Sequence, residues 1–99
     1  MIHHATNTTF NTLLTTSNKP ILVDFYADWC GPCMAMMPVL ENLSADGYDI
    51  IKVNIDENEE LANEYGVRSI PYFIVFEDGQ PTQEAIGMQT IDALKDMLK

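Results

Sequence analysis

At 99 residues the chain has room for one hydrophobic core and no second domain, so we expect a single domain over residues 1–99. Fifteen acidic against five basic residues give a formal net charge of −10, which disfavours nucleic acid and anionic membranes and serves either solubility or partners with basic rims. No apolar stretch approaches a membrane span, and residues 1–4 lack the features of a signal peptide, which predicts a cytoplasmic protein.

The first third of the chain predicts two strands with a helix between them. Residues 2–5 fit a short edge strand, and a cap rich in Thr and Asn precedes a helix that carries Phe10, Leu13 and Leu14 on one face. Residues 21–27 form an apolar run that is continuous enough for a strand buried on both faces. We expect this run to lie in the middle of a sheet.

The middle of the chain continues the alternation of helix and strand. A helix over about residues 30–44 should kink at Pro38, because proline removes one backbone hydrogen bond. Residues 49–55 predict the next strand, and a helix over residues 59–65 should end at Gly66, a residue that suits a left-handed cap.

The last third predicts a hairpin followed by a helix. Residues 72–77 and 82–86 should pair through the turn residues Asp78 and Gly79, and Thr90 should cap the final helix. Strands that alternate with helices and end in a hairpin imply an α/β fold, with a central mixed sheet of four to five strands flanked by helices on both faces.

The only two cysteines of the chain lie in the segment Trp29-Cys30-Gly31-Pro32-Cys33, just after the predicted central strand. Proline suits the first turn of a helix, so a helix should start near Cys30. Residues three apart on a helix are close enough for a disulfide, and the short loop so closed adds little stability. The pair is therefore better suited to opening and closing than to holding the fold together.

The two sulfurs should differ in reactivity. Cys30 lies at the helix N-terminus, where unpaired amide groups favour the thiolate, whereas Cys33 lies further in and is more covered. Cys30 would then attack a substrate disulfide, and Cys33 would resolve the mixed disulfide. Two alternatives remain open, which are a zinc site that adds His3 and His4 to the cysteines and a permanent structural disulfide.

Asp24 is an ionisable residue in the middle of the apolar run, where burial is costly unless the carboxyl is neutral or paired. Burial would raise its pKa toward the range in which a group can move protons near neutral pH. The alternative is a carboxylate that faces solvent from a half-exposed strand.

The segment around the cysteines belongs to a longer pattern. It runs Val23-Asp24-Phe25-Tyr26-Ala27-Asp28-Trp29-Cys30-Gly31-Pro32-Cys33. Further segments follow in order, at Lys52-Val53-Asn54-Ile55-Asp56, Tyr65-Gly66-Val67-Arg68-Ser69-Ile70-Pro71 and Phe76-Glu77-Asp78-Gly79. Over nearly the whole chain this pattern resembles the thioredoxin family, and the resemblance implies the thioredoxin fold.

The resemblance also implies roles for particular residues. Asp24 is expected beneath Cys33 as the acid or base that deprotonates it, with Lys52 as a neighbour. The peptide bond before Pro71 is expected to be cis and to pack against the cysteines, which leaves the Ile70 backbone free to pair with an extended substrate segment.

Four further residues complete the substrate surface that the resemblance implies. Gly31 and Pro32 lie between the cysteines, Trp29 covers the edge of the site, and Gly87 lets the substrate approach closely. Trp29 could equally serve packing, and Gly87 could be a plain turn residue.

The chain departs from the family pattern at four positions. Met34 stands where a basic residue is usual, and Asp28 adds a negative charge; both disfavour the Cys30 thiolate and favour a stronger reductant. Tyr72 replaces a small hydroxyl residue and Tyr26 replaces a tryptophan, which bears on substrate preference.

The sequence thus predicts a thiol–disulfide oxidoreductase that reduces disulfide-containing substrate proteins and acts as a monomer. By resemblance, its electrons come from an NADPH-dependent thioredoxin reductase, and the chain itself binds no cofactor and no metal. The alternative is a redox-dispensable binding module, or a subunit of a larger assembly, that uses the same surface.

Overall fold

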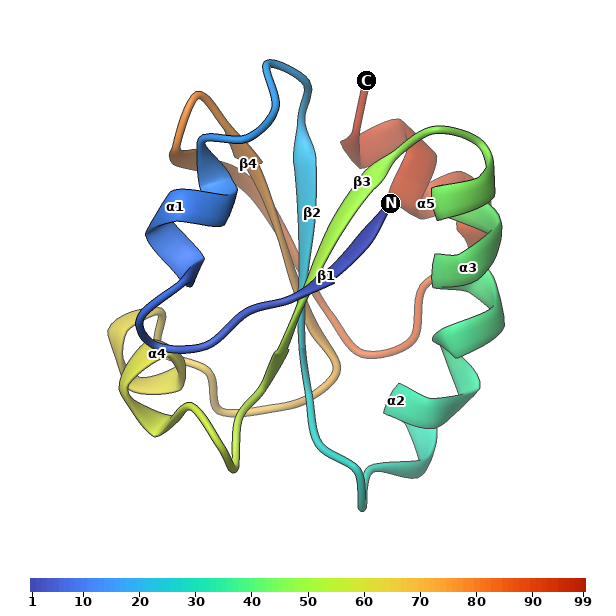
Figure 1. Ribbon diagram of the computed structural model, residues 1–99. Helices are drawn as coiled ribbons and strands as arrows, with labels where there is room; N and C mark the ends of the chain where they lie inside the picture. Colours follow the sequence, from blue (N-terminus) through green and yellow to red (C-terminus); the bar gives the residue numbers. More distant parts are fainter.

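The computed structural model describes all residues from Met1 to Lys99. Five strands and five helices follow one another, in the predicted order except that two helices take the place of the one expected over residues 30–44 (Figure 1). The strands are β1 (Ile2–His4), β2 (Ile21–Tyr26), β3 (Asp49–Asn54), β4 (Tyr72–Glu77) and β5 (Gln80–Ile86). The helices are α1 (Phe10–Leu14), α2 (Gly31–Ala35), α3 (Met37–Ala45), α4 (Glu59–Glu64) and α5 (Ile91–Met97). None of these helices is long and apolar enough to cross a lipid bilayer.

All five strands belong to one mixed sheet, in the order β1-β3-β2-β4-β5. β3 runs parallel to both β1 and β2, whereas β4 runs antiparallel to both β2 and β5. β2 is therefore the central strand. All six of its residues are buried, as the continuous apolar run predicts.

Helices cover both faces of the sheet (Figure 1). On one face lie α1 and α4, and Phe10 of α1 packs in the same core as Val23 of β2. On the other face lie α2, α3 and α5, and Leu40 and Leu94 share a second core with Leu22. Because successive side chains of a strand point to opposite faces, the even-numbered residues of β2 face the side of α2, α3 and α5.

The single helix expected over residues 30–44 is divided into α2 and α3 by one residue, Met36. Pro38 has no N–H to donate to the carbonyl of Met34, so regular helical bonding is interrupted in this turn. The predicted kink is thus confirmed, and the cysteines lie at the start of a helix of five residues.

The hairpin turn at Asp78 and Gly79 is tighter than predicted, so β5 begins at Gln80 instead of Thr82. Both turn residues have positive φ angles, 52° and 78°, the combination that a type I′ turn requires.

Two predicted helix-end signals are confirmed. Gly66 follows α4 with a φ of 65°, which a residue with a side chain rarely adopts. The Thr90 hydroxyl accepts a hydrogen bond from the Ala93 N–H at 3.1 Å and so caps α5.

We expect Phe10→Ala to lower the free energy of unfolding by about 3–5 kcal/mol, because it leaves a cavity in the core. Phe10 is fully buried, and its ring packs edge-on against Tyr65 and Phe76, with centroid distances of 5.6 and 5.7 Å. Urea denaturation measures the loss. Asn11→Ala, on the exposed side of the same helix, is the matched control and should change stability by less than about 0.5 kcal/mol; similar losses in both variants would contradict the prediction.

Candidate active site

The cysteine pair lies where β2 leads into α2. Cys30 is the N-cap residue of α2, and a disulfide joins it to Cys33 with a Cα–Cα distance of 5.2 Å. The Cys33 N–H donates a hydrogen bond to the Cys30 sulfur at 3.1 Å. Gly31 and Pro32 form the first turn, where proline costs no hydrogen bond.

The loop before β4 closes over the cysteines. The carbonyl oxygen of Ile70 lies 3.9 Å from the Cys30 sulfur, and Ile70 packs against the small cluster that contains both cysteines. The peptide bond between Ile70 and Pro71 is cis, as the resemblance implies. The Gly87 N–H donates to the Pro71 carbonyl at 2.8 Å, so the structure brings these three residues together beside Cys30.

Trp29 lies at the rim of the site and is 70% exposed. Its indole N–H donates to the Asp56 carboxylate at 2.8 Å, which fixes one end of the ring. Sequence reasoning placed Trp29 at the edge but missed Asp56, because the two residues come from segments that only the fold brings together.

Asp24 is buried, with 1% of its surface exposed, so the alternative of a solvent-facing carboxylate is wrong. It faces the side of the sheet covered by α2, since it alternates with Leu22 of the core there and with Tyr26, which packs beside the cysteines. Its Oδ1 is the one buried side-chain nitrogen or oxygen atom without a hydrogen-bond partner. Burial raises the pKa of Asp24 to about 7, although the positive charge of Lys52 acts in the opposite direction.

Lys52 lies directly beside Asp24, because the two residues are paired in the register of β2 and β3. It is 6% exposed, yet none of the salt bridges in the protein includes it. Its ammonium group lies over the ring of Tyr26, 4.3 Å from the centroid. Sequence reasoning paired Lys52 with Asp24 and did not foresee this contact with Tyr26.

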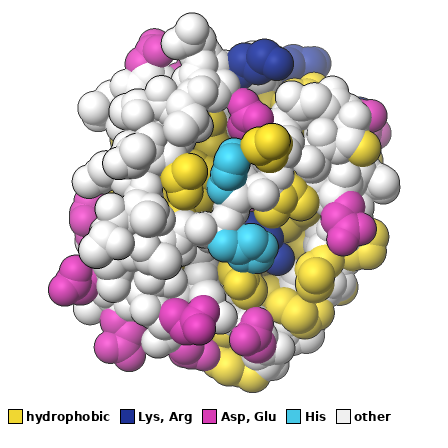
Figure 2. Space-filling model, viewed as in Figure 1, with side chains coloured by type: hydrophobic (Ala, Val, Ile, Leu, Met, Phe, Trp, Pro, Cys, Tyr) yellow, Lys and Arg dark blue, Asp and Glu magenta, His cyan; other side chains and the backbone are white.

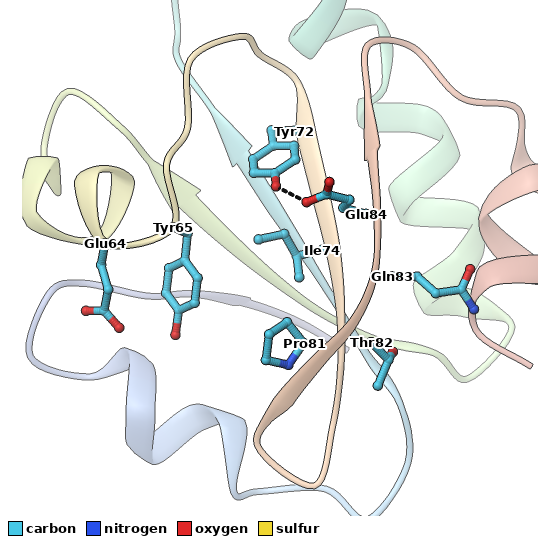
Figure 3. A pocket seen from close by; sticks show the side chains of 8 residues that line it. All are labelled: Glu64, Tyr65, Tyr72, Ile74, Pro81, Thr82, Gln83 and Glu84. Atoms are coloured by element: carbon cyan, nitrogen blue, oxygen red, sulfur yellow. Dashed lines mark hydrogen bonds between the residues drawn. The ribbon is translucent and has the colours of Figure 1, made fainter.

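Tyr72 points away from the cysteines, although it follows Pro71 directly. It lines a cavity of about 400 Å³ with Tyr65 and Glu84, on the side of the sheet that α4 covers (Figure 3). Its hydroxyl donates a hydrogen bond to Glu84, and burial, followed by Glu84, raises its pKa to about 12. Neither cysteine lines this cavity.

His3 and His4 lie on β1, at an edge of the sheet. No group of three or more His, Cys, Asp or Glu residues lies together in a way that could hold a metal ion. The histidines therefore do not complete a zinc site with the cysteines.

A disulfide between near neighbours, with one sulfur at a helix start and a free backbone segment beside it, suits exchange with the disulfides of other molecules. Geometry of this kind defines a thiol–disulfide oxidoreductase.

Comparison with known proteins identifies the family. The thioredoxin family model matches residues 1–99. The chain is 37% identical over 101 residues to a thioredoxin of Rickettsia prowazekii (strain Madrid E), covering 99% of this chain and 96% of that protein. It is 50% identical over 80 residues to a thioredoxin of Staphylococcus aureus, covering 78% and 77%. A solved structure of a mutant thioredoxin from Halobacterium salinarum NRC-1 matches with a TM-score of 0.90 at 41% identity, covering 98% of this chain and 87% of the other.

The chain belongs to the thioredoxin family, and it has the thioredoxin fold. Like its relatives it is a protein-disulfide reductase that acts on disulfide substrates.

The raised pKa of Asp24 predicts a specific pH dependence of stability. Between about pH 4 and pH 7 the folded state holds a proton that the unfolded state has released, so the free energy of unfolding falls as the pH rises through this window. A pKa raised from 3.8 to about 7 corresponds to about 4 kcal/mol. We therefore expect Asp24→Asn to be more stable than the unsubstituted protein at pH 8, by up to that amount, and nearly equal at pH 4.

Urea denaturation at pH 4 and pH 8 checks this expectation. Asp96→Asn, which removes an exposed carboxylate, is the control and should show no such pH-dependent gain. An Asp24→Asn variant that is less stable than the unsubstituted protein at pH 8 would contradict the prediction that the buried charge is destabilising.

Proposed function

We propose that Cys30 attacks substrate disulfides and that Cys33 resolves the mixed disulfide. The Cys30 thiolate of the reduced protein bonds to one sulfur of the substrate disulfide, and the other substrate sulfur leaves as a thiolate. Cys33 then loses its proton and bonds to the Cys30 sulfur, which releases the second substrate thiolate. Two electrons pass to the substrate, and the chain is left with the Cys30–Cys33 disulfide.

The observation that carries this assignment is the 3.1 Å contact between the Cys33 N–H and the Cys30 sulfur. In the reduced protein the same amide would donate to a Cys30 thiolate, and a hydrogen bond to the charged form favours that form. Both cysteines are buried in the oxidised protein, with 5% of Cys30 and 2% of Cys33 exposed, so the assignment rests on the amide contact and not on exposure.

We assign to Asp24 the removal of the Cys33 proton. A general base works best when its pKa lies near the operating pH, and burial brings that of Asp24 to about 7. Its Oδ1 has no competing partner within the protein. Lys52, the neighbouring cation in the sheet, would stabilise the carboxylate before it takes up the proton.

The substrate is proposed to lie along Ile70 as an extended segment. Ile70 takes part in no backbone–backbone hydrogen bond, and its carbonyl oxygen has only the Cys30 sulfur near it, at 3.9 Å, so its backbone is available to pair with an added strand. The proposed substrate surface consists of Trp29, Gly31, Pro32, Ile70, Pro71 and Gly87.

The oxidised pair must be returned to the dithiol for a second turnover. We propose that an NADPH-dependent thioredoxin reductase does this and that the chain binds no cofactor itself. This cycle needs a reducing compartment such as the cytoplasm, where dithiols of this kind are catalytic.

We expect Cys33→Ser to accumulate a covalent complex with a model protein disulfide such as insulin, because the mixed disulfide at Cys30 then lacks its resolving thiol. Non-reducing electrophoresis detects the complex, and peptide mapping locates the bond. Cys30→Ser is the matched control and should form no such complex. Trapping through Cys33 in the Cys30→Ser variant at an equal rate would reverse the assignment.

A binding role is the second candidate, because the surface around the site is apolar and open. Trp29, Ile86 and Met88 are 70%, 62% and 59% exposed. Replacing both Cys30 and Cys33 by Ser should abolish the biological effect of a reductase but spare that of a binding module. Complementation of a strain that lacks its own thioredoxin separates the two, and growth restored by the double variant would favour the binding role.

A further inference from the structure

Lys52 and Asp24 are neighbours of opposite charge that do not form a salt bridge. A lysine beside a buried carboxyl would ordinarily pair with it, and pairing would hold the carboxyl ionised. The ammonium of Lys52 lies instead over the Tyr26 ring, 4.3 Å from its centroid. Tyr26 itself is one of the positions at which the chain departs from the family pattern.

Two observations show that Asp24 is unpaired. Oδ1 has no hydrogen-bond partner, and burial outweighs the attraction of Lys52 in setting the proton affinity of the carboxyl. An ammonium that moved from the ring to Oδ1 would satisfy that atom and strengthen the charge interaction, because the two groups would then meet in a medium of low dielectric.

Two small cavities explain why Lys52 can remain apart from the carboxyl. Lys52 lines a cavity of about 230 Å³ with Tyr26 and Glu57, and another of about 130 Å³ with Glu41; His4 lines both. Figure 2 shows a basic side chain recessed beside a histidine on this face, with hydrophobic side chains next to it and acidic side chains further out. The ammonium can therefore be solvated from the β1 edge while its stem stays buried.

We propose that Tyr26 is a positioning residue whose ring holds the Lys52 ammonium off Asp24, so that Asp24 can take up a proton at neutral pH. An ammonium within about 6 Å of a ring centroid is attracted to the aromatic face even where water reaches the cation, and burial holds the Tyr26 ring in place. The consequence for turnover rests on the proposed role of Asp24, whereas the positioning itself does not.

The surrounding groups allow a clean test. The titratable groups that line the two cavities with Lys52 are His4 on β1, Glu41 on α3 and Glu57 after β3. Asp28, after β2, acts on Tyr26 through its charge, and the disulfide-bonded cysteines do not titrate in the oxidised protein. Phe73 of β4, opposite Asp24, is neutral. Carbon-13 at the aspartate carboxyl carbons therefore reports the titration of Asp24 directly in the oxidised protein.

We expect Tyr26→Leu to lower the titration midpoint of Asp24 by about 1 unit or more, since the freed ammonium can approach the carboxyl. Tyr26→Phe keeps the ring and should leave the midpoint near that of the unsubstituted protein. Tyr26→Met serves as a second ring-free variant if Tyr26→Leu does not fold, as judged by circular dichroism.

The double variant Tyr26→Leu with Lys52→Met shows whether the midpoint of Asp24 falls because the Lys52 charge approaches or because loss of the ring changes the hydration of the carboxyl. Its midpoint is compared with that of Lys52→Met alone. Loss of the ring should lower the midpoint only when Lys52 is present. An equal fall without Lys52, or no fall in either ring-free variant, would overturn the proposal. The rate of release from the Cys30 mixed disulfide in Asp24→Asn tests the proton-transfer role separately, so either idea can fail alone.

Discussion

β2 must be buried on both faces, and this constraint shapes the rest of the molecule. Its backbone pairs with β3 on one side and β4 on the other, so its side chains can be covered only by helices above and below the sheet. One core forms under α1 and α4, and the other under α3 and α5. Cys30 follows the same strand by four residues, and Asp24 lies within the strand on the face of the second core. The packing of the core therefore also positions the site.

The burial of Asp24 is expensive for a small protein. About 4 kcal/mol is a large part of the 5–15 kcal/mol by which domains of this size are usually stable. A salt bridge to Lys52 would reduce this penalty, but it would also lower the pKa of the carboxyl and so make Asp24 a weaker proton acceptor near pH 7. An Asp24 without a salt bridge to Lys52 therefore lowers the stability of the fold, but its carboxyl can gain and lose a proton near neutral pH.

The loop before β4 and the first residue of β4 contact opposite faces of the sheet. Ile70 lies against the Cys30 sulfur, whereas Tyr72, two residues later, points to the cavity under α4 and binds Glu84. The departure from the family pattern at Tyr72 therefore does not change the immediate surroundings of the sulfurs. Met34, by contrast, packs against the cysteine cluster, where a missing positive charge bears on the thiolate.

Sequence by itself determined the features that depend on neighbouring residues: the spacing of the cysteines, the kink near Pro38, the turn at Asp78, and the cap at Thr90. Local stereochemistry sets these, because each needs only a few consecutive residues. The unpaired state of Asp24, the Lys52 contact with Tyr26 and the bond from Trp29 to Asp56 were decided by the tertiary structure alone. Each depends on which side chains of separate elements meet and on how completely the core excludes water. A pattern of neighbouring residues specifies neither of these.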